Sequence, residues 1–182
     1  LPASAPYGRH TMATVGVRAP DDWATHLAAA AAQARRVNAR VRIGTQAARY
    51  DAADSALFAW SVRGDSPVGV AGFTVHPSFS GAGGVEARLR AADRWLRAAG
   101  TIPADKALWV LDVHAYPAAH GEASQERTVW HTVAWASTHP QVRGVIVTEP
   151  GDYDAITGLR AANGRLRSAV AGMRRARAVL AE

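Results

Sequence analysis

The stretch ALWVLDV at residues 107–113 decides the fold class of this chain. Only Asp112 interrupts an otherwise continuous apolar run, and a second run, PVGVAGFTV at residues 67–75, is apolar on both faces. Strands of this kind are typical of a parallel sheet that other elements cover on both sides. The two runs therefore predict two strands of a parallel α/β sheet.

The sequence on either side of these runs predicts two more strands, a loop and five helices. Shorter β-branched runs predict strands at residues 40–45 (RVRIGT) and 142–148 (VRGVIVT), and residues 1–20, rich in proline and glycine, predict a loop. Apolar residues at helical spacing predict the helices, with both Trp130 and Trp135 toward the core. These helices cover residues 20–38, 54–62 (led by Asp54 or Ser55), 85–98, 124–138 and 168–180. The order αβαβαβαβα predicts a parallel sheet with right-handed crossovers.

Length and composition predict one domain over residues 1–182. The hydrophobic content of 48% suffices for a substantial core. A complete (β/α)₈ barrel takes about 250 residues, so a chain of 182 residues is short for one. The expected fold is therefore a partial barrel with about four parallel strands.

The net charge of +6 raises the question of an anionic partner such as nucleic acid. Lys106 is the one lysine, so the other 20 of the 21 basic residues are arginine, and alanine is abundant. A GC-rich genome produces this bias, and no basic motif interleaved with aromatic residues stands against that explanation. We therefore expect no nucleic-acid partner.

The sequence contains no cysteine, so disulfides and thiolate metal sites are excluded. No apolar run approaches the length of about 18 residues that a membrane span needs, and no signal-peptide pattern opens the chain. The compartment stays open, with secretion or the cell envelope favoured. The chain begins at Leu1, so we expect that it was processed or is part of a longer protein.

Polar side chains stand at or just beyond the end of each predicted strand. In parallel α/β folds, ligands bind beyond the carboxyl ends of the strands. Because side chains alternate along a strand, Asp112 and His114 share a face with Val110. Facing into a barrel, the strand-end side chains would converge on one mouth as two carboxylates, two histidines and an amide. These residues are Gln46, His76, Asp112, His114 and Glu149.

Each of these residues also has a structural interpretation. His76 precedes Pro77 and can be a loop residue that bonds backbone groups, and Asp112 can pair with an arginine, since an unpaired buried carboxylate is costly. The loop at residues 115–122 adds Tyr116, His120 and Glu122. Glu122 can serve as a catalytic or sugar-binding carboxylate. Alternatively, its negative charge can stabilise the amino end of the next helix.

Two segments resemble known enzymes. LWVLDVHAYP (108–117) resembles the seventh strand of the clan-A glycoside hydrolases. These are (β/α)₈ enzymes that include cellulases, mannanases and β-1,4-galactanases. Their seventh strand carries the nucleophile in a pattern such as W-V-T-E-x-G-Y-P. Residues 144–169 resemble the eighth strand of these enzymes and the stretch after it. In the family that stretch reads G-L followed by D-G-R-x-K/R-x-A. The matching residues here are Gly158-Leu159 and NGRLRSA at 163–169. The resemblance covers roughly residues 20 to 182.

The resemblance implies a protein or fragment that hydrolyses O-glycosidic bonds of a polysaccharide or oligosaccharide, without a cofactor or metal. It makes Asp112 the nucleophile and Glu122 the second choice, with Glu149 as a further catalytic carboxylate. The substrate-binding residues implied are Gln46, His76, His114 and Tyr116. A retaining glycosidase needs two carboxyl groups about 5 to 5.5 Å apart.

The sequence departs from the family pattern at two points. The family nucleophile is usually glutamate, whereas Asp112 is shorter, and no N-E motif of the kind that carries the general acid precedes Trp23. We therefore expect the first barrel half to come from a longer protein, a partner chain or a second copy, unless it has been lost. The isolated chain is then expected to be inactive, because the general acid lies outside this sequence.

Two other function classes remain open from the residues. In a metal-dependent hydrolase or isomerase, nitrogen and oxygen ligands would gather at the barrel mouth. Those ligands would be His76, Asp112, His114 and Glu149. The third class is a noncatalytic sugar-binding or assembly module derived from a glycosidase.

Overall fold

The structure is a computed structural model that describes residues 20–76, 84–113, 121–147 and 158–180. For residues 20–24, 112 and 177–180 it describes the backbone alone. The elements in chain order are α1 (Pro20–Val37), β1 (Ile43–Ala47), α2 (Ala52–Ser61), β2 (Val68–Val75), α3 (Val85–Ala99), β3 (Ala107–Val113), α5 (Glu122–Ser137), β4 (Val142–Val147) and α6 (Ser168–Leu180).

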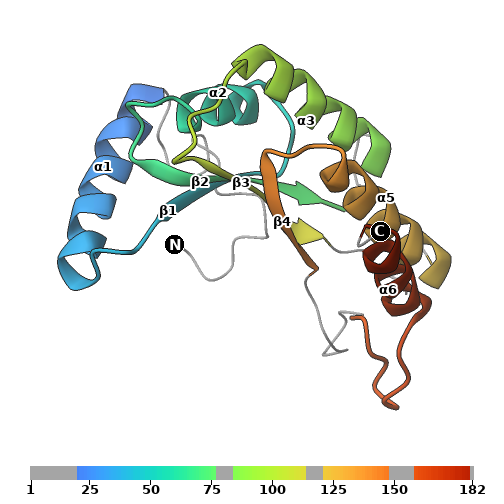
Figure 1. Cartoon of the computed structure of the whole chain (residues 1–182). Coiled ribbons are helices and arrows are strands. Elements are labelled where there is room, and N and C mark those ends of the chain that lie inside the picture. The colour runs from blue at the N-terminus through green and yellow to red at the C-terminus, as the bar shows by residue number, and fades with distance from the viewer. Residues whose placement is uncertain (1–19, 77–83, 114–120, 148–157, 181–182) are drawn as a thin grey trace. The chain divides into compact units, whose positions relative to one another are not determined.

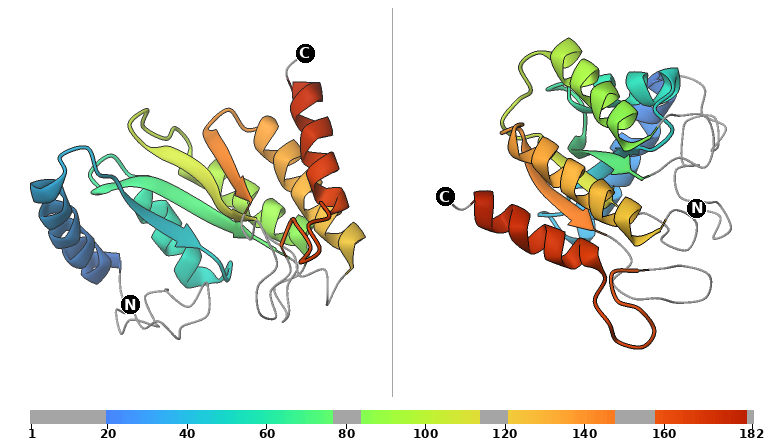
Figure 2. Two further views of the ribbon diagram at one scale, coloured as in Figure 1. Left: turned by 90° about the horizontal axis from the view of Figure 1, so that it is seen from below. Right: turned by 90° about the vertical axis from the view of Figure 1, so that its right-hand side faces the viewer.

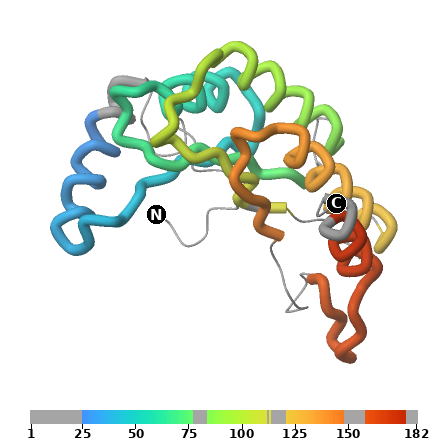
Figure 3. The backbone as a smooth tube through the Cα atoms, in the orientation of Figure 1, coloured from blue at the N-terminus to red at the C-terminus, as the bar shows by residue number. Residues whose placement is uncertain are grey.

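Four parallel strands form one sheet in the order β1-β2-β3-β4 and alternate with helices along the chain (Figure 1; the path is traced in Figure 3). This confirms the predicted α/β class. In a doubly wound sheet the strand order reverses at a switch point, whereas here spatial order follows chain order. The arrangement is compatible with a partial (β/α)₈ barrel.

The first strand begins later than the sequence predicts. Residues 40–45 were the expected strand, but β1 covers Ile43–Ala47. The reason is a turn at Asn38, whose side-chain oxygen accepts the Arg40 N–H at 2.9 Å and whose carbonyl accepts the Val41 N–H at 3.1 Å. Both bonds divert the backbone from the ladder, so pairing starts only after the turn.

Helix α2 begins earlier than predicted. Asp51, not Asp54 or Ser55, is the N-cap residue, and its Oδ1 accepts the Asp54 N–H at 3.0 Å. An aspartate at this position satisfies one of the unpaired N–H groups of the first turn. Asp54 is thereby placed inside the helix, where its carboxylate is available for the preceding loop.

The chain forms two compact units, each built from two segments. The first consists of residues 1–74 and 91–109, and the second of residues 75–90 and 110–182. In the first unit, α2 packs on β1, and the Thr45 and Ser61 hydroxyls lie 2.8 Å apart in a buried hydrogen bond. An aromatic cluster fills this unit, since the Phe58 ring centroid lies 5.2 Å from that of Phe73 and 5.9 Å from that of Trp95.

The core of the second unit is aliphatic. Its buried centre contains Val75, Val110, Val113 and Val129, and α5 and α6 run side by side (Figure 2). Trp135 packs against this centre, as predicted.

The prediction for Trp130 is wrong, because this side chain is 39% exposed. The buried residues on this part of α5 are Thr128, Val129 and Thr132. One residue further along a helix turns the side chain by about 100°, so Trp130 lies on the flank of the buried stripe.

Candidate functional site

The structure places the predicted site residues unevenly. Side chains are described for Gln46, His76 and Glu122, while Asp112 is described as the penultimate residue of β3 without its side chain. His114, Tyr116, His120 and Glu149 lie outside the described residues. The first unit contains Gln46, and the other described candidates belong to the second unit.

Gln46 is joined to the neighbouring strand by its side chain. It lies in β1 opposite Gly72 of β2, and its Nε2 donates a hydrogen bond to the buried hydroxyl of Thr74. Residues two apart in a strand share a face, so Gln46 and Thr74 lie on the same side of the strand pair. This partly buried polar pair lies toward the carboxyl end of β1.

The loop between β1 and α2 wraps around a buried carboxylate. Asp54 is 0% exposed, and its Oδ2 accepts three backbone N–H groups of that loop. The donors are Ala48 at 2.9 Å, Arg49 at 2.7 Å and Tyr50 at 2.8 Å. Burial raises the pKa of the Asp54 carboxyl above its ordinary value of 3.8, and the three N–H donors oppose that rise.

Tyr50 has an uncommon backbone conformation, with φ of +60°. Three contacts hold it there. Its N–H bonds Asp54, its hydroxyl donates to the Thr74 carbonyl oxygen at 2.9 Å, and its ring stacks on Trp95 with centroids 5.2 Å apart. The loop is thus fixed to β2 and α3 as well as to α2.

Sequence reasoning missed this arrangement of Tyr50, Asp54 and Thr74. Asp54 was interpreted only as a residue that leads the helix. An aspartate in the first turn of a helix that follows a strand could have predicted it. Such a carboxylate can accept hydrogen bonds from the backbone N–H groups of the loop before the helix.

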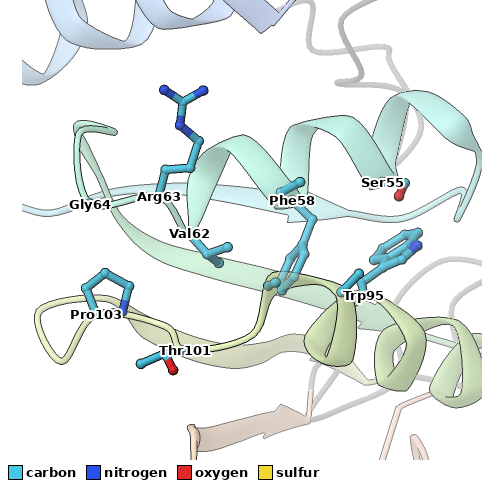
Figure 4. A pocket seen from close by; sticks show the side chains of 11 residues that line it. Ser55, Phe58, Val62, Arg63, Gly64, Trp95, Thr101 and Pro103 are labelled. Carbon is cyan, nitrogen blue, oxygen red and sulfur yellow. The ribbon is translucent and has the colours of Figure 1, made fainter.

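A cavity of about 390 Å³ lies between α2 and α3 in the first unit (Figure 4). Phe58, Val62 and Trp95 supply its apolar walls, and Ser55 and Thr101 add hydroxyl groups. Arg63, the one charged residue in its lining, pairs with exposed Asp65. The residues described in this lining include no carboxylate or imidazole that could act as a general acid or base or activate the two hydroxyls.

Glu122 is tied to the stretch before α6. It is the first residue of α5, and its carboxylate forms ion pairs with Arg165 and with Arg167, whose Nε lies 3.5 Å from Oε1. Arg167 is buried and also donates to the Gly158 carbonyl at 3.3 Å. These contacts favour a structural function for Glu122, and its part in catalysis stays a prediction.

The N-G-R stretch forms a tight bend. Arg160 and Leu166 make an antiparallel bridge, and Gly164 between them has φ of +83°, which suits glycine. The amide of buried Gln125 in α5 donates to the Gly158 carbonyl at 3.1 Å. The bend is therefore held to α5 at its base as well as by Glu122.

Replacing Glu122 by glutamine is expected to lower the midpoint of thermal unfolding, because it removes the charge that pairs with two arginines. Hydrolysis, where it is measured, should stay within about twofold, whereas loss of a general acid or base costs about 10²-fold or more. Glu86→Gln, which removes an exposed i,i+4 pair with Arg90, is the matched control. A 10²-fold loss of rate with unchanged stability would contradict the structural function.

The described part of the chain contains no group of three histidine, aspartate or glutamate residues that could hold a metal ion. Of the four ligands in the metal-dependent alternative, only the side chain of His76 is described, so that alternative stays a prediction. Across the described ranges, no helix combines the length and apolar character needed to cross a membrane. Comparison of the chain with models of known protein families and with curated proteins finds no match.

Proposed function

We propose that this chain supplies the carboxyl-terminal half of a (β/α)₈ barrel that hydrolyses O-glycosidic bonds of a polysaccharide or oligosaccharide. The observation that supports it most is the strand order β1-β2-β3-β4, in which each strand is followed in the chain by a helix. Such a sheet presents the carboxyl ends of its strands as the reaction site.

In this proposal Asp112 is the nucleophile. It is the penultimate residue of β3, at the carboxyl end where a barrel enzyme carries its catalytic groups. Its carboxylate would attack the anomeric carbon as the glycosidic oxygen leaves with a proton from a general acid. Water would then cleave the glycosyl-enzyme ester, with the same acid acting as base.

The remaining roles follow from position along the chain. Glu149 comes two residues after β4 and is the next strand-end carboxylate, while the general acid lies outside these 182 residues. His76 is half-buried one residue after β2. With His114 and Tyr116 it would orient the nucleophile or bind sugar hydroxyls, and Gln46 would bind sugar through its amide.

The test first measures the intact mass and the solution mass of the natural protein, which give its chain length and its assembly. The hydrolysis of β-linked polysaccharides and aryl glycosides is then compared between this protein and the 182-residue chain. We expect hydrolysis with retained anomeric configuration by the complete protein and none by the 182-residue chain. Turnover by the shorter chain would contradict the external acid.

Two other outcomes would replace the proposal. Sugar binding without turnover by the complete protein would identify a noncatalytic sugar-binding module. Activity that chelation abolishes, and that zinc or manganese restores, would identify the metal-dependent class.

A further inference from the structure

A groove runs between α5 and α6 on the surface of the second unit. Its volume is about 510 Å³, within the range of ligand sites, and the exposed indole of Trp130 lies in its wall. The other lining residues are Ala123, Glu126, Arg127, Gly172 and Arg175. Both helices are packed together, so the groove has a fixed floor.

Gly172 leaves the groove open, because it has no side chain to fill the space between the two helices. It is buried in α6, and a Cβ at this position would lie 3.4 Å from Cγ of Glu126, in van der Waals contact. A larger residue would fill the groove beside Glu126. The space beside Glu126 in this groove therefore depends on a residue without a side chain.

Among the residues that the structure describes, the charged groups of the groove leave one cation without an ion pair. Glu126 pairs with Arg175 across the two helices. Arg127 is exposed and forms no ion pair with any residue that the structure describes. It precedes Trp130 by three residues, so the two side chains share one helix face. The groove thus combines a flat aromatic surface with a guanidinium that no described carboxylate pairs with.

Arg127 also borders a second hollow of about 450 Å³ on its other side. The acidic residue of that hollow, Glu86, pairs with Arg90, and His131 lies at its edge. Neither hollow contains an unpaired carboxylate among its lining residues. The electrostatic field around Arg127 therefore favours an anion.

We propose that this groove binds a uronic-acid unit of an acidic polysaccharide. The apolar face of the sugar ring would pack on the Trp130 indole, which is large and rigid, and the sugar carboxylate would accept two hydrogen bonds from Arg127. The guanidinium fork matches a carboxylate in geometry.

Other anionic partners fit the groove less well. Nucleic acid needs several phosphate contacts, whereas this groove offers one cation that no described residue pairs with. A helical acidic peptide needs apolar anchors at successive turns, whereas Trp130 is the one large apolar side chain in the lining. A neutral sugar would leave Arg127 without a partner. The site is independent of the proposed hydrolysis, because none of its residues lies at a strand end.

The test is isothermal titration of the protein with tetragalacturonate and, as the neutral comparison, cellotetraose. We expect binding of the acidic sugar alone. Trp130→Ala and Arg127→Gln should each weaken it about tenfold, the loss typical of removing a hydrogen bond to a charged group or an aromatic contact. Trp130→Phe should retain part of the affinity, and circular dichroism should show unchanged folding for every variant.

Arg36→Gln is the matched control, because it removes one exposed positive charge from α1. An equal loss in this variant would show that net charge, rather than the groove, attracts the sugar. Unchanged affinity in Trp130→Ala, equal binding of cellotetraose, or tighter binding of a single-stranded oligonucleotide or a polyglutamate peptide would also overturn the proposal. Hydrolysis is measured on the same preparations, so that failure of sugar binding in the groove can be distinguished from failure of the proposed hydrolysis.

Discussion

Replacing Asp112 by asparagine is expected to reduce kcat of the complete protein by about 10⁴-fold. Asparagine keeps the shape of the side chain but cannot form the glycosyl-enzyme ester, and removing one member of a catalytic unit removes most of the covalent route. The dissociation constant of the substrate should change by less than about threefold, because the side-chain volume is kept. Steady-state kinetics on the substrate that the panel identifies, with titration of the same substrate, measure both quantities.

Asp105→Asn is the matched control, since Asp105 is an exposed aspartate just before β3. It should leave kcat unchanged. A stricter test uses Asp112→Gly with added azide, which should restore turnover and give a glycosyl azide of opposite anomeric configuration. Rescue would separate a nucleophile from a residue that merely supports the fold. Asp112→Asn activity above about a tenth of the original would exclude the nucleophile assignment.

Replacing Asp54 by alanine is expected to lower the free energy of unfolding by about 3 kcal/mol. The carboxylate accepts three backbone N–H groups, and a buried donor left without a partner costs roughly 1–3 kcal/mol. Water reaching the partly buried donors of Arg49 and Tyr50 should offset part of that cost. Urea denaturation followed by far-ultraviolet circular dichroism gives the value.

Asp65→Ala is the control for charge removal, because Asp65 is exposed and pairs with Arg63. It should change stability little. If Asp54→Ala were no more destabilising than Asp65→Ala, the loop at Ala48 to Tyr50 would hold its conformation without the carboxylate. Such a result would leave the Tyr50 contacts as the main restraint.

The pH dependence of stability follows from the raised pKa of Asp54. A carboxyl whose pKa is higher in the folded state contributes stability below its unfolded-state pKa, and that stability is lost as pH rises through the folded-state pKa. Relative to Asp54→Asn, which does not titrate, the free energy of unfolding should therefore fall as pH rises from 3.8, by at most about 1.4 kcal/mol per pH unit. A relative increase with pH would show that the three N–H donors outweigh burial.

Several features could be predicted because they depend on neighbours in sequence. The apolar runs at 67–75 and 107–113 became β2 and β3, and the helices around them formed close to the expected residues. Errors of a few residues at β1 and α2 came from local hydrogen bonds of Asn38 and Asp51, which compete with the strand and the helix for the same backbone groups.

The candidate site could be predicted less completely. That polar residues follow the strands is visible in the sequence, and Gln46 does meet a neighbouring strand. The pairing of Glu122 with Arg165 joins residues 43 apart, and nothing in the local pattern distinguishes this from a capping or catalytic carboxylate. Trp130 and Trp135 have similar helical surroundings, and only the packing of α6 and the core shows that the first is exposed.

The sequence by itself determined the α/β class and the order of elements, because hydrophobic periodicity and backbone preference act over a few residues. Only the tertiary structure decided that the carboxylate of Asp54 holds the β1–α2 loop, that Tyr50 adopts a positive φ against Thr74 and Trp95, and that Gly172 leaves space beside Glu126. Each of these depends on groups brought together from distant positions, and their contacts exist only once the apolar elements have packed.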